Sequence, residues 1–448
     1  MFYQHKTQFE TKQYNIRDYI LIGATLFSMS LPIAAQAADE NTSVLLKKIK
    51  QLETRIIDLE SSTVLSDPET RVKKIQVYID ENGLEHNTPV ANSRAVTTYQ
   101  RERVYRRQTI NEKIGEALED AASKQVRLGV DAAIILQNVN QPKGTNKKAD
   151  RKFYQLASTD LYFSAGLAQY TIFFADIVGL SGTPPDNDID GLTLMNGYSA
   201  RLVNQNDLSL REAWVMSELW DQKLSFVMGR VDLTNYFDSN AAANDETSQF
   251  LSDALVNNPA LGLSENGAGM ALTYDPKSKF NFKIGYQQSS SKAKSLSDSL
   301  FLLAEAGYKT NLFQLGEGNY RVWYRQDNTG GNSTAQGLSF DQRVSPGMTL
   351  FARYGVTNNS NNQKNKYYSA GMQFDAGLGF NPQDIFGVGY AESRETGNKS
   401  EKLIESYYKL VLTEKLQLTF NITLLEEQRS TSVVDSYVIS GMRLQSKF

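Results

Sequence analysis

Residues 416–424 read LQLTFNITL, and this strict alternation of apolar and polar side chains decides the fold class. Successive side chains of a β-strand point to opposite faces, so the apolar residues share one face and the amides and threonines share the other. The same alternation returns at residues 280–287, 320–325 and 349–356. The sequence therefore predicts an all-β protein from residue 126 onward.

The connections between the predicted strands favour a transmembrane barrel over a soluble sandwich, whose strands would alternate in the same way. The pattern contains about sixteen strands, an even number as bacterial barrels require. Short turns and long polar loops follow one another, and residues 377–383 are the one extended short turn. Outer-membrane barrels have short periplasmic turns and long extracellular loops, whereas a sandwich has no reason for this order. The long loops are predicted at residues 138–156, 180–208, 232–266, 288–299, 327–335, 357–365, 392–401 and 426–434.

The C-terminus agrees with a barrel. Residues 441–448 read GMRLQSKF, in which Met442, Leu444 and the terminal Phe448 share one face. A terminal Phe that closes an alternating strand resembles the assembly signal of outer-membrane barrels, although Ser446 departs from the usual apolar residue. We therefore predict a transmembrane antiparallel β-barrel over residues 126–448.

One long polar segment interrupts the strands. Residues 229–269 read GRVDLTNYFDSNAAANDETSQFLSDALVNNPALGLSENGAG, which begins as the end of one strand and ends as the start of another. A segment of this length without a helix or strand pattern of its own is unusual in a compact domain and usually has a function.

Motifs in and around this segment resemble a known family when they are taken in order. They are LREAWV at residues 210–215, GRVDLTNYFDSN at 229–240, NDETSQF at 244–250, NNPA at 257–260 and NGAG at 266–269. The series resembles the carbohydrate-selective porin family, the OprB family, most strongly over residues 210–269 and less over the rest of the barrel. Residues 38–124 show no clear match to it. The resemblance implies a channel of the bacterial outer membrane that admits sugars, whereas the pattern alone implies only a polar lumen.

The N-terminus has the features of a secretory signal peptide at residues 1–37. A basic start precedes an apolar stretch at residues 19–34, and AQA at residues 35–37 fits the cleavage pattern. Residues 38–62 predict a short coiled coil that could associate subunits on the periplasmic side, with an isolated amphipathic helix as the alternative. The apolar positions spaced by four and three residues are Leu45, Ile49, Leu52, Ile56 and Leu59.

Residues 63–125 are predicted to form a periplasmic extension. It contains an alternating strand at residues 75–79 before an Asn82-Gly83 turn signal, and it ends in a helix at residues 109–124. A basic cluster around Tyr105 could contact lipid A phosphate, peptidoglycan or a glycan, but a solvated face is the preferred interpretation. The cluster consists of Arg101, Arg103, Arg106 and Arg107.

Composition excludes most enzyme chemistry. The chain has no Cys, which removes disulfides, thiol nucleophiles and Cys-based zinc sites. Of its two histidines, His5 lies in the signal peptide and His86 precedes the barrel. The G-x-S-x-G, H-E-x-x-H and P-loop motifs are absent, and a net charge of −3 gives no strong attraction to nucleic acid. We therefore predict no enzymatic activity, no cofactor and no nucleic-acid partner.

One acidic stretch opens like a calcium-binding loop. Residues 186–191 read DNDIDG, which fits the D-x-D-x-D-G opening. The twelfth position is Gly197, however, where an EF-hand needs a bidentate Glu. An acidic surface loop is the preferred interpretation, and no metal site is predicted.

The alternation also assigns the two faces of the barrel wall. A cation on the lipid face at mid-bilayer costs about 2–4 kcal/mol, so charged positions should face the lumen. Trp323 then lies between two inward arginines, where a flat indole suits a sugar ring, with generic lumen lining as the alternative. The predicted pore-lining and sugar-binding residues are Lys283, Arg321, Trp323, Arg325, Arg353, Gln373, Asp375 and Lys409.

The loop at residues 232–266 is predicted to fold into the barrel and narrow the pore opposite those arginines. A loop inside a barrel must satisfy its backbone groups against fixed partners, and short polar side chains bond backbone groups well. Apolar anchors would be Tyr236, Phe237, Phe250 and Leu255. The polar residues of the predicted constriction are Asn235, Asp238, Asn240, Asn244 and Asp245. A loop that caps the channel from outside is the alternative.

These observations predict an outer-membrane porin that passes carbohydrates by facilitated diffusion through a water-filled, loop-constricted channel. A general or anion-selective porin is one alternative, suggested by the inward arginines. An envelope-tethering structural protein is another, suggested by the coiled coil and the basic cluster. The expected partners are sugars as permeants, outer-membrane lipid and further copies of the chain in a dimer or trimer.

Overall fold

The structure is a computed structural model, and it describes two parts of the chain. The first comprises residues 70–79, 85–86, 91 and 94–103. The second comprises residues 126–448 without 296–297, 312–315, 330, 346, 362, 376–382, 414 and 431–432. The predicted signal peptide, coiled coil and helix at residues 109–124 lie outside the described residues.

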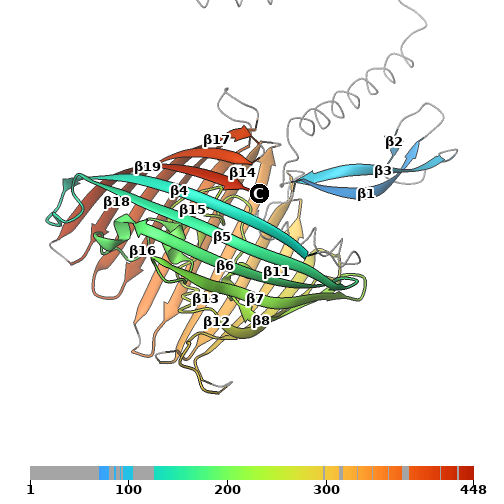
Figure 1. The fold of residues 1–448 in the computed structure, drawn as a ribbon, viewed down its shortest axis with the longest axis horizontal. Coiled ribbons are helices and arrows are strands. Elements are labelled where there is room, and N and C mark those ends of the chain that lie inside the picture. The colour runs from blue at the N-terminus through green and yellow to red at the C-terminus, as the bar shows by residue number, and fades with distance from the viewer. Residues whose placement is uncertain are drawn as a thin grey trace, which may run out of the picture. The chain divides into compact units, whose positions relative to one another are not determined.

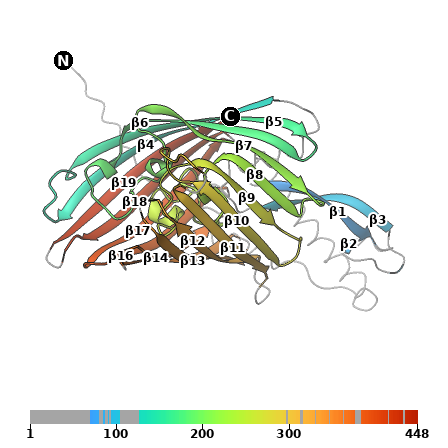
Figure 2. The ribbon, with the colours of Figure 1, turned by 90° about the horizontal axis from the view of Figure 1, so that it is seen from below.

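The second part forms a closed antiparallel barrel of sixteen strands, β4 to β19, which confirms the predicted architecture (Figures 1 and 2). Each strand pairs with the next along the chain, and β19 pairs with β4 to close the ring. The strands are β4 (Val126–Lys143), β5 (Lys152–Ala168), β6 (Thr171–Thr183), β7 (Asp207–Leu219), β8 (Leu224–Val231), β9 (Gly267–Tyr274), β10 (Phe280–Gln288), β11 (Leu300–Thr310), β12 (Gly318–Asp327), β13 (Ser333–Ser345), β14 (Met348–Asn358), β15 (Lys364–Phe374), β16 (Ile385–Glu395), β17 (Lys399–Thr413), β18 (Leu416–Gln428) and β19 (Val434–Lys447).

The two faces of the wall follow the alternation of the sequence. On β12, Val322 is 50% exposed on the outer face, whereas its neighbour Trp323 is 1% exposed inside. On β18, Ile422 is 48% exposed and Asn421 and Thr423 are buried. The outer face is therefore an apolar surface of the kind that meets lipid, and charged residues of the middle of the wall, such as Arg353 and Lys409, are buried inside.

Several connections are shorter than predicted. Strand β4 continues to Lys143, so the loop predicted at residues 138–156 covers only residues 144–151. The connection between β16 and β17, predicted at residues 392–401, covers only 396–398. Polar side chains gather at these outer strand ends and resemble loop composition, yet their backbones still pair with the neighbouring strand.

The connection at residues 289–299 agrees with the loop predicted at 288–299, and two longer connections hold the described helical turns. The second lumen segment, residues 184–206, joins β6 to β7 and contains η2 (Pro185–Asn187) and η3 (Gly197–Ala200). The long lumen segment, residues 232–266, joins β8 to β9 and contains η4 (Leu233–Asn235) and α4 (Asp253–Val256). No helix of the described residues is long and apolar enough to cross a membrane.

The first described part is a small sheet with the strand order β2-β1-β3. It consists of β1 (Thr70–Ile79), β2 (Glu85–His86) and β3 (Arg94–Arg103). Strand β1 includes the predicted strand at residues 75–79, and Tyr78 pairs with His86 across the hairpin. Arg101 and Arg103 of the basic cluster belong to β3, whereas Arg106 and Arg107 lie outside the described residues.

Candidate functional site

The long lumen segment lies inside the barrel, because its side chains and backbone contact inward-facing residues of the wall. Phe237 packs where Gly285 of β10 has no side chain, since a Cβ added at Gly285 would lie 2.8 Å from the Phe237 ring. On the far side of the segment, the Leu251 and Ser252 N–H groups donate to the Glu405 carboxylate of β17 at 2.7 and 2.8 Å. The segment therefore crosses the lumen instead of capping the channel from outside.

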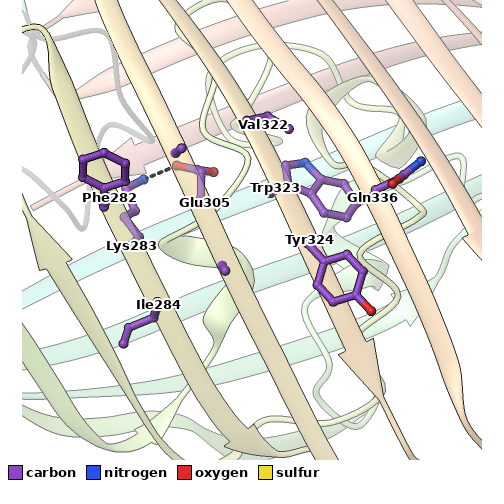
Figure 3. Close-up of a pocket in the computed structure, with 10 residues that line it drawn as sticks. Phe282, Lys283, Ile284, Glu305, Val322, Trp323, Tyr324 and Gln336 are labelled. Carbon is purple, nitrogen blue, oxygen red and sulfur yellow. Dashed lines mark ion pairs between the residues drawn. The ribbon is translucent and has the colours of Figure 1, made fainter.

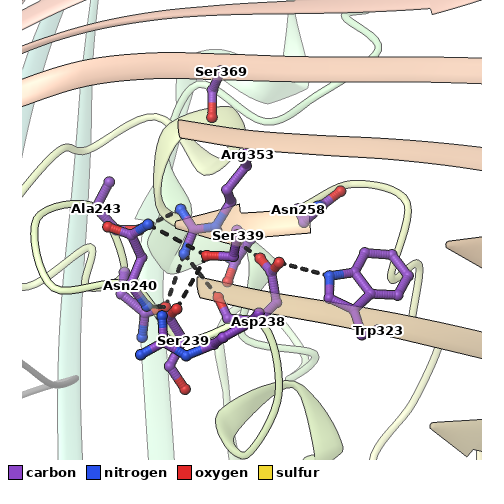
Figure 4. Close-up of polar contacts among 12 residues, drawn as sticks. Asp238, Ser239, Asn240, Ala243, Asn258, Trp323, Ser339, Arg353 and Ser369 are labelled. Atoms are coloured by element: carbon purple, nitrogen blue, oxygen red, sulfur yellow. Dashed lines mark hydrogen bonds and ion pairs between the residues drawn. The ribbon is translucent and has the colours of Figure 1, made fainter. Parts of the chain in front are cut away.

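Arg353 of β14 holds this segment against the wall (Figure 4). Its Nε lies 2.7 Å from Asp238 Oδ2, and both side chains are almost fully buried. The guanidinium also donates to four acceptors of the segment, which are the carbonyls of Asp238, Ala243 and Leu255 and the Asn244 Oδ1. One inward arginine thus ties together residues that are up to seventeen positions apart, from 238 to 255.

Trp323 does not have the open ring face that the sugar-stacking hypothesis requires. The residue is 1% exposed, and its Nε1 donates to Asp238 Oδ1 at 2.7 Å. The ring fills the space above Gly337 of β13, where an added Cβ would lie 2.3 Å from Trp323 Cζ2. Trp323 faces inward as predicted, but its contacts position Asp238 and are not available to a permeant.

The inward residues of β15 to β19 also bind the long lumen segment. Gln373 Oε1 accepts from Gln249 Nε2 at 3.3 Å and from the Tyr407 hydroxyl at 3.1 Å, and Gln373 Nε2 donates to Asp375 Oδ1. Arg443, which the sequence analysis missed, donates to the Glu246 and Gln249 carbonyls. Like these residues, Lys409 is buried, so solvent does not reach this part of the wall.

The polar residues that were predicted for the constriction form hydrogen bonds with nearby backbone and side-chain groups, as short polar side chains commonly do. Asn240 Nδ2 donates to the Phe340 carbonyl at 3.0 Å, and Asn244 Oδ1 accepts from the Asn240 N–H at 3.1 Å. Asp245 accepts from the Thr247 N–H at 2.8 Å, and Asn235 Nδ2 donates to Glu212 Oε2 at 2.9 Å. These bonds give the segment one defined path across the lumen.

The second lumen segment also enters the barrel, which the sequence analysis did not predict. Arg201 lies 2.5 Å from Asp160 of β5 and 2.8 Å from Glu246 of the long lumen segment, with all three side chains buried. Asn196 Nδ2 donates to Gln137 Oε1 of β4 at 2.9 Å. The only sequence signal for this contact was Arg201, an isolated arginine in a long polar loop. It could not identify carboxylate partners so distant along the chain.

Lumen cations remain partly open to solvent near β10 to β12. Lys283 lies 2.8 Å from Glu305, and its side chain is 16% exposed while that of Glu305 is fully buried. Arg321 lies 2.8 Å from Asp341, with side-chain exposures of 14% and 2%. In both pairs the cation is the partner that solvent reaches.

A cavity of about 300 Å³ lies at the outer strand ends, where residues 259–262 meet β12 to β16. Its lining includes Arg325, Asp327 and Tyr367 together with Lys366 and Arg394. Arg325 itself is held by the Leu261 carbonyl at 2.8 Å and the Ser333 hydroxyl at 2.5 Å. Of the predicted site residues, Arg325 is the one that contributes to this polar mouth.

A second cavity, of about 400 Å³, is not part of the lumen. It lies over Ala304 and Ala306 on the outer face of β10 to β13, between the exposed side chains of Phe282, Ile284 and Tyr324 (Figure 3). Lys283 and Trp323 also line this cavity, because they lie on the same strands as these outward residues. Its apolar lining suits the lipid-facing surface and gives no path to a sugar.

The acidic stretch at residues 186–191 does not gather into a cation site. Asp186 accepts from the Met195 N–H, while Asp188 Oδ2 lies 3.0 Å from Lys152 Nζ and accepts from the Tyr154 hydroxyl. Burial raises the pKa of Asp186 to about 7, whereas the Lys152 hydrogen bond lowers the pKa of Asp188. No group of three metal-ligating side chains is present in the described ranges.

Comparisons with known proteins agree with the barrel. A family model described as carbohydrate-selective porin, OprB family, matches residues 270–448. The match covers β10 to β19 and most of β9, beyond the residues 210–269 on which the sequence resemblance rests. In fold, the chain is similar to the high-pH structure of Pseudomonas putida OprB, with a TM-score of 0.61 and 16% identity, covering 75% of this chain and 96% of that one.

Relatives with a similar sequence include an uncharacterised protein of Aquifex aeolicus, 28% identical over 221 residues. That alignment covers 49% of this chain and 63% of the relative, so this chain spans less than two-thirds of its length. Porin AaxA of Chlamydia abortus is 24% identical over 324 residues, which cover 67% of this chain and 70% of the porin. The fold and these matches assign the protein to the bacterial outer membrane, as a barrel with an OprB-type fold.

Proposed function

We propose, from the OprB family match at residues 270–448 and the closed sixteen-strand barrel, that this protein is a porin for carbohydrates. Permeants would cross by facilitated diffusion through a lumen that the two lumen segments narrow. The sugar class comes from the family description, and the polar mouth and lumen are compatible with it. Sugars present many hydroxyls, which charged and amide side chains can bond in turn as the permeant advances.

The observation that carries this proposal is the anchoring of the long lumen segment. A loop outside the barrel could drift, but this one bonds inward residues on β11, β12, β14, β15, β17 and β19. A segment fixed to so many strands sets the lumen cross-section in a defined way. Such a fixed narrowing allows selection by size and hydrogen bonding, which an open pore would not give.

The predicted site residues then take two roles. Lys283, Arg321 and Arg325 would meet the permeant, because the first two are partly exposed to solvent and Arg325 lines the outer mouth. The others would support the wall and the constriction from behind: Trp323, Arg353, Gln373, Asp375 and Lys409.

A channel that prefers anions is the second candidate, favoured by the exposure of the lumen ion pairs. The carboxylates of Glu305 and Asp341 are buried, whereas Lys283 and Arg321 reach solvent. Permeants would therefore meet positive charge even though each pair is neutral overall. Field lines from such exposed cations concentrate anions in a narrow polar channel.

Planar-bilayer recording distinguishes these functions. With the purified protein, a panel of mono- and disaccharides should lower the ion current in a saturable manner if the lumen binds sugars. Reversal potentials across a KCl gradient then report ion preference, and Lys283→Gln with Arg321→Gln should move them toward cations. A current that no sugar reduces would contradict the carbohydrate function, and an unchanged reversal potential in the double variant would contradict the anion preference.

A further inference from the structure

Strands β15 to β17 follow one another in the barrel wall (Figure 1). Their outer ends carry cations on the outer face. Tyr367 points inward, since its hydroxyl donates to the Ala254 carbonyl, and its neighbours Lys366 and Tyr368 therefore face outward. Lys366 pairs directly with Arg394 in the register of β15 and β16. Two cations thus stand opposite one another on the same exposed face.

Arg394 is held in this position by its neighbours. Its Nε pairs with Glu392, its Nη2 donates to the Tyr368 hydroxyl at 3.4 Å, and its guanidinium lies 6.0 Å from the centre of the Tyr368 ring. Glu392 in turn accepts from the Tyr390 hydroxyl at 2.6 Å. The carboxylate is 3% exposed at its side chain and the arginine 58%, so the cation covers the acid and faces outward.

The height of these cations on the barrel matches the headgroups of a membrane. Tyr368 and Tyr390 pack at 6.1 Å and resemble the aromatic girdle that marks a membrane interface. Below them, Ile404 and Leu424 are paired and largely exposed, as lipid-facing side chains are. Lys366 lies two residues beyond Tyr368, which places it about 7 Å further out along the strand.

The remaining charges of this face are mixed. Lys402 pairs with Glu426 at 3.7 Å, and Lys364 continues the outward row beyond Lys366. Like charges directly opposite on one sheet face are destabilising. The juxtaposition of Lys366 and Arg394 therefore favours an anion between them, and the described neighbours in the same register, Val356, Ser400 and Gln428, supply no second carboxylate.

We propose that Lys366 and Arg394 bind the phosphate of a lipid in the outer leaflet of the outer membrane. The acyl chains of that lipid would extend along Tyr390, Ile404 and Leu424, and Lys402 would contribute a further positive charge. Both side chains face outward, and their strand ends also border the cavity at the outer mouth. The lipid site goes beyond the transport function and does not depend on which permeant the channel selects.

Native mass spectrometry of the full-length protein in detergent tests the site with a defined probe, a bisphosphorylated lipid A. The matched variants are Lys366→Gln/Arg394→Gln and a control, Lys292→Gln/Lys294→Gln, which removes two exposed cations from the loop after β10. Losing two charge-assisted contacts should weaken lipid binding by about tenfold or more, while the control binds as the native protein does. Dephosphorylated lipid A should bind weakly to all three proteins.

Three results would overturn the proposal. They are equal binding of the phosphorylated lipid to the double variant, equal binding of the dephosphorylated lipid to the native protein, and displacement of the lipid by millimolar inorganic phosphate alone. Single-channel conductance of each variant serves as the check on folding. Because both side chains face outward, sugar block should remain native in the double variant even where lipid binding is lost.

Discussion

Replacing Arg353 by Met should release the long lumen segment while leaving the barrel wall intact. Met keeps much of the length and apolar stem of the side chain but removes the charge and all donors. The backbone of β14 would still pair with β13 and β15 through its own ladder. The loss therefore falls on the contacts between wall and segment, namely the Asp238 ion pair and four hydrogen bonds.

The expected size of this effect follows from the burial of the pair. Removing one partner of a buried ion pair costs about 3–5 kcal/mol, because the other charge is left buried without compensation. At about 1.4 kcal/mol per factor of ten, the equilibrium between the docked and released segment shifts by roughly a hundredfold to several thousandfold. Asp238→Asn in the same chain removes the stranded carboxylate and should restore part of the docking.

Two measurements report the release of the segment. Hydrogen exchange at the Leu251 and Ser252 amides should accelerate, because these groups bond the Glu405 carboxylate of the wall only while the segment is docked. Single-channel conductance should rise and become noisier, and sugar block should weaken.

Arg321→Met is the matched control, since Arg321 pairs with Asp341 of β13 and bonds no residue of the segment in the described chain. If Arg353→Met folds into a barrel yet keeps native amide protection and conductance, then the segment does not depend on this anchor and the reasoning is wrong. An equal effect of both variants would point to a general loss of lumen charge instead.

Further predictions concern separate features of the structure. Trp323→Phe should remove the bond to Asp238, at a cost of about 1–3 kcal/mol in docking, and leave sugar affinity in the docked state unchanged in titrations of block; a large loss of affinity would restore the stacking role. Gly389→Val should displace Leu255, since even a Cβ at this position would lie 2.8 Å from Leu255 Cδ2, and exchange in α4 should rise; native exchange there would contradict the packing. Burial raises the pKa of Asp186 from 3.8 to about 7 in the docked segment. The protonated carboxyl therefore stabilises docking fully below pH 3.8, and this stabilisation is lost as the pH rises through 7. The protection factor of the Met195 amide, which corrects for the pH dependence of intrinsic exchange, should therefore fall between about pH 4 and pH 7, and a matched Asp186→Asn variant that shows the same fall would exclude Asp186 as its source. Single cysteines at Asn332, Asn361 and Ser430 should be labelled in intact cells and those at Asp275 and Thr413 should not; the opposite result would reverse the orientation of the barrel.

The wall of the barrel could be predicted from the sequence because a period of two residues is imposed locally. At residues 416–424 every second side chain must tolerate lipid, and the register with β17 and β19 then follows from pairing neighbours along the chain. The predicted strand ends were wrong where this constraint stops. Beyond the apolar band, as at Asn138 and Lys402, strands carry polar residues on both faces and composition no longer separates strand from loop.

The interior was harder to predict because its contacts join residues far apart in the sequence. Arg353 was correctly expected to face inward, and residues 232–266 were correctly expected to enter the lumen. The Asp238 partner of Trp323 could not be foreseen, since that bond spans 85 positions and depends on the path of the whole segment. The same limit hid the second lumen segment, whose Arg201 contacts two carboxylates from different elements.

Apolar and polar contacts of the long lumen segment have different consequences. Phe237, Phe250 and Leu255 are almost fully buried, and such burial favours docking without fixing one arrangement, because it has no direction. Buried ion pairs add little net stability relative to apolar residues of similar size, but they exclude positions in which a charge would lack its partner. We infer that the Asp238–Arg353 pair and the Glu405 carboxylate determine where the segment crosses the lumen, while the aromatic and aliphatic anchors determine how tightly it stays there. A channel that must discriminate permeants by size needs a defined crossing path of the segment as much as it needs tight docking.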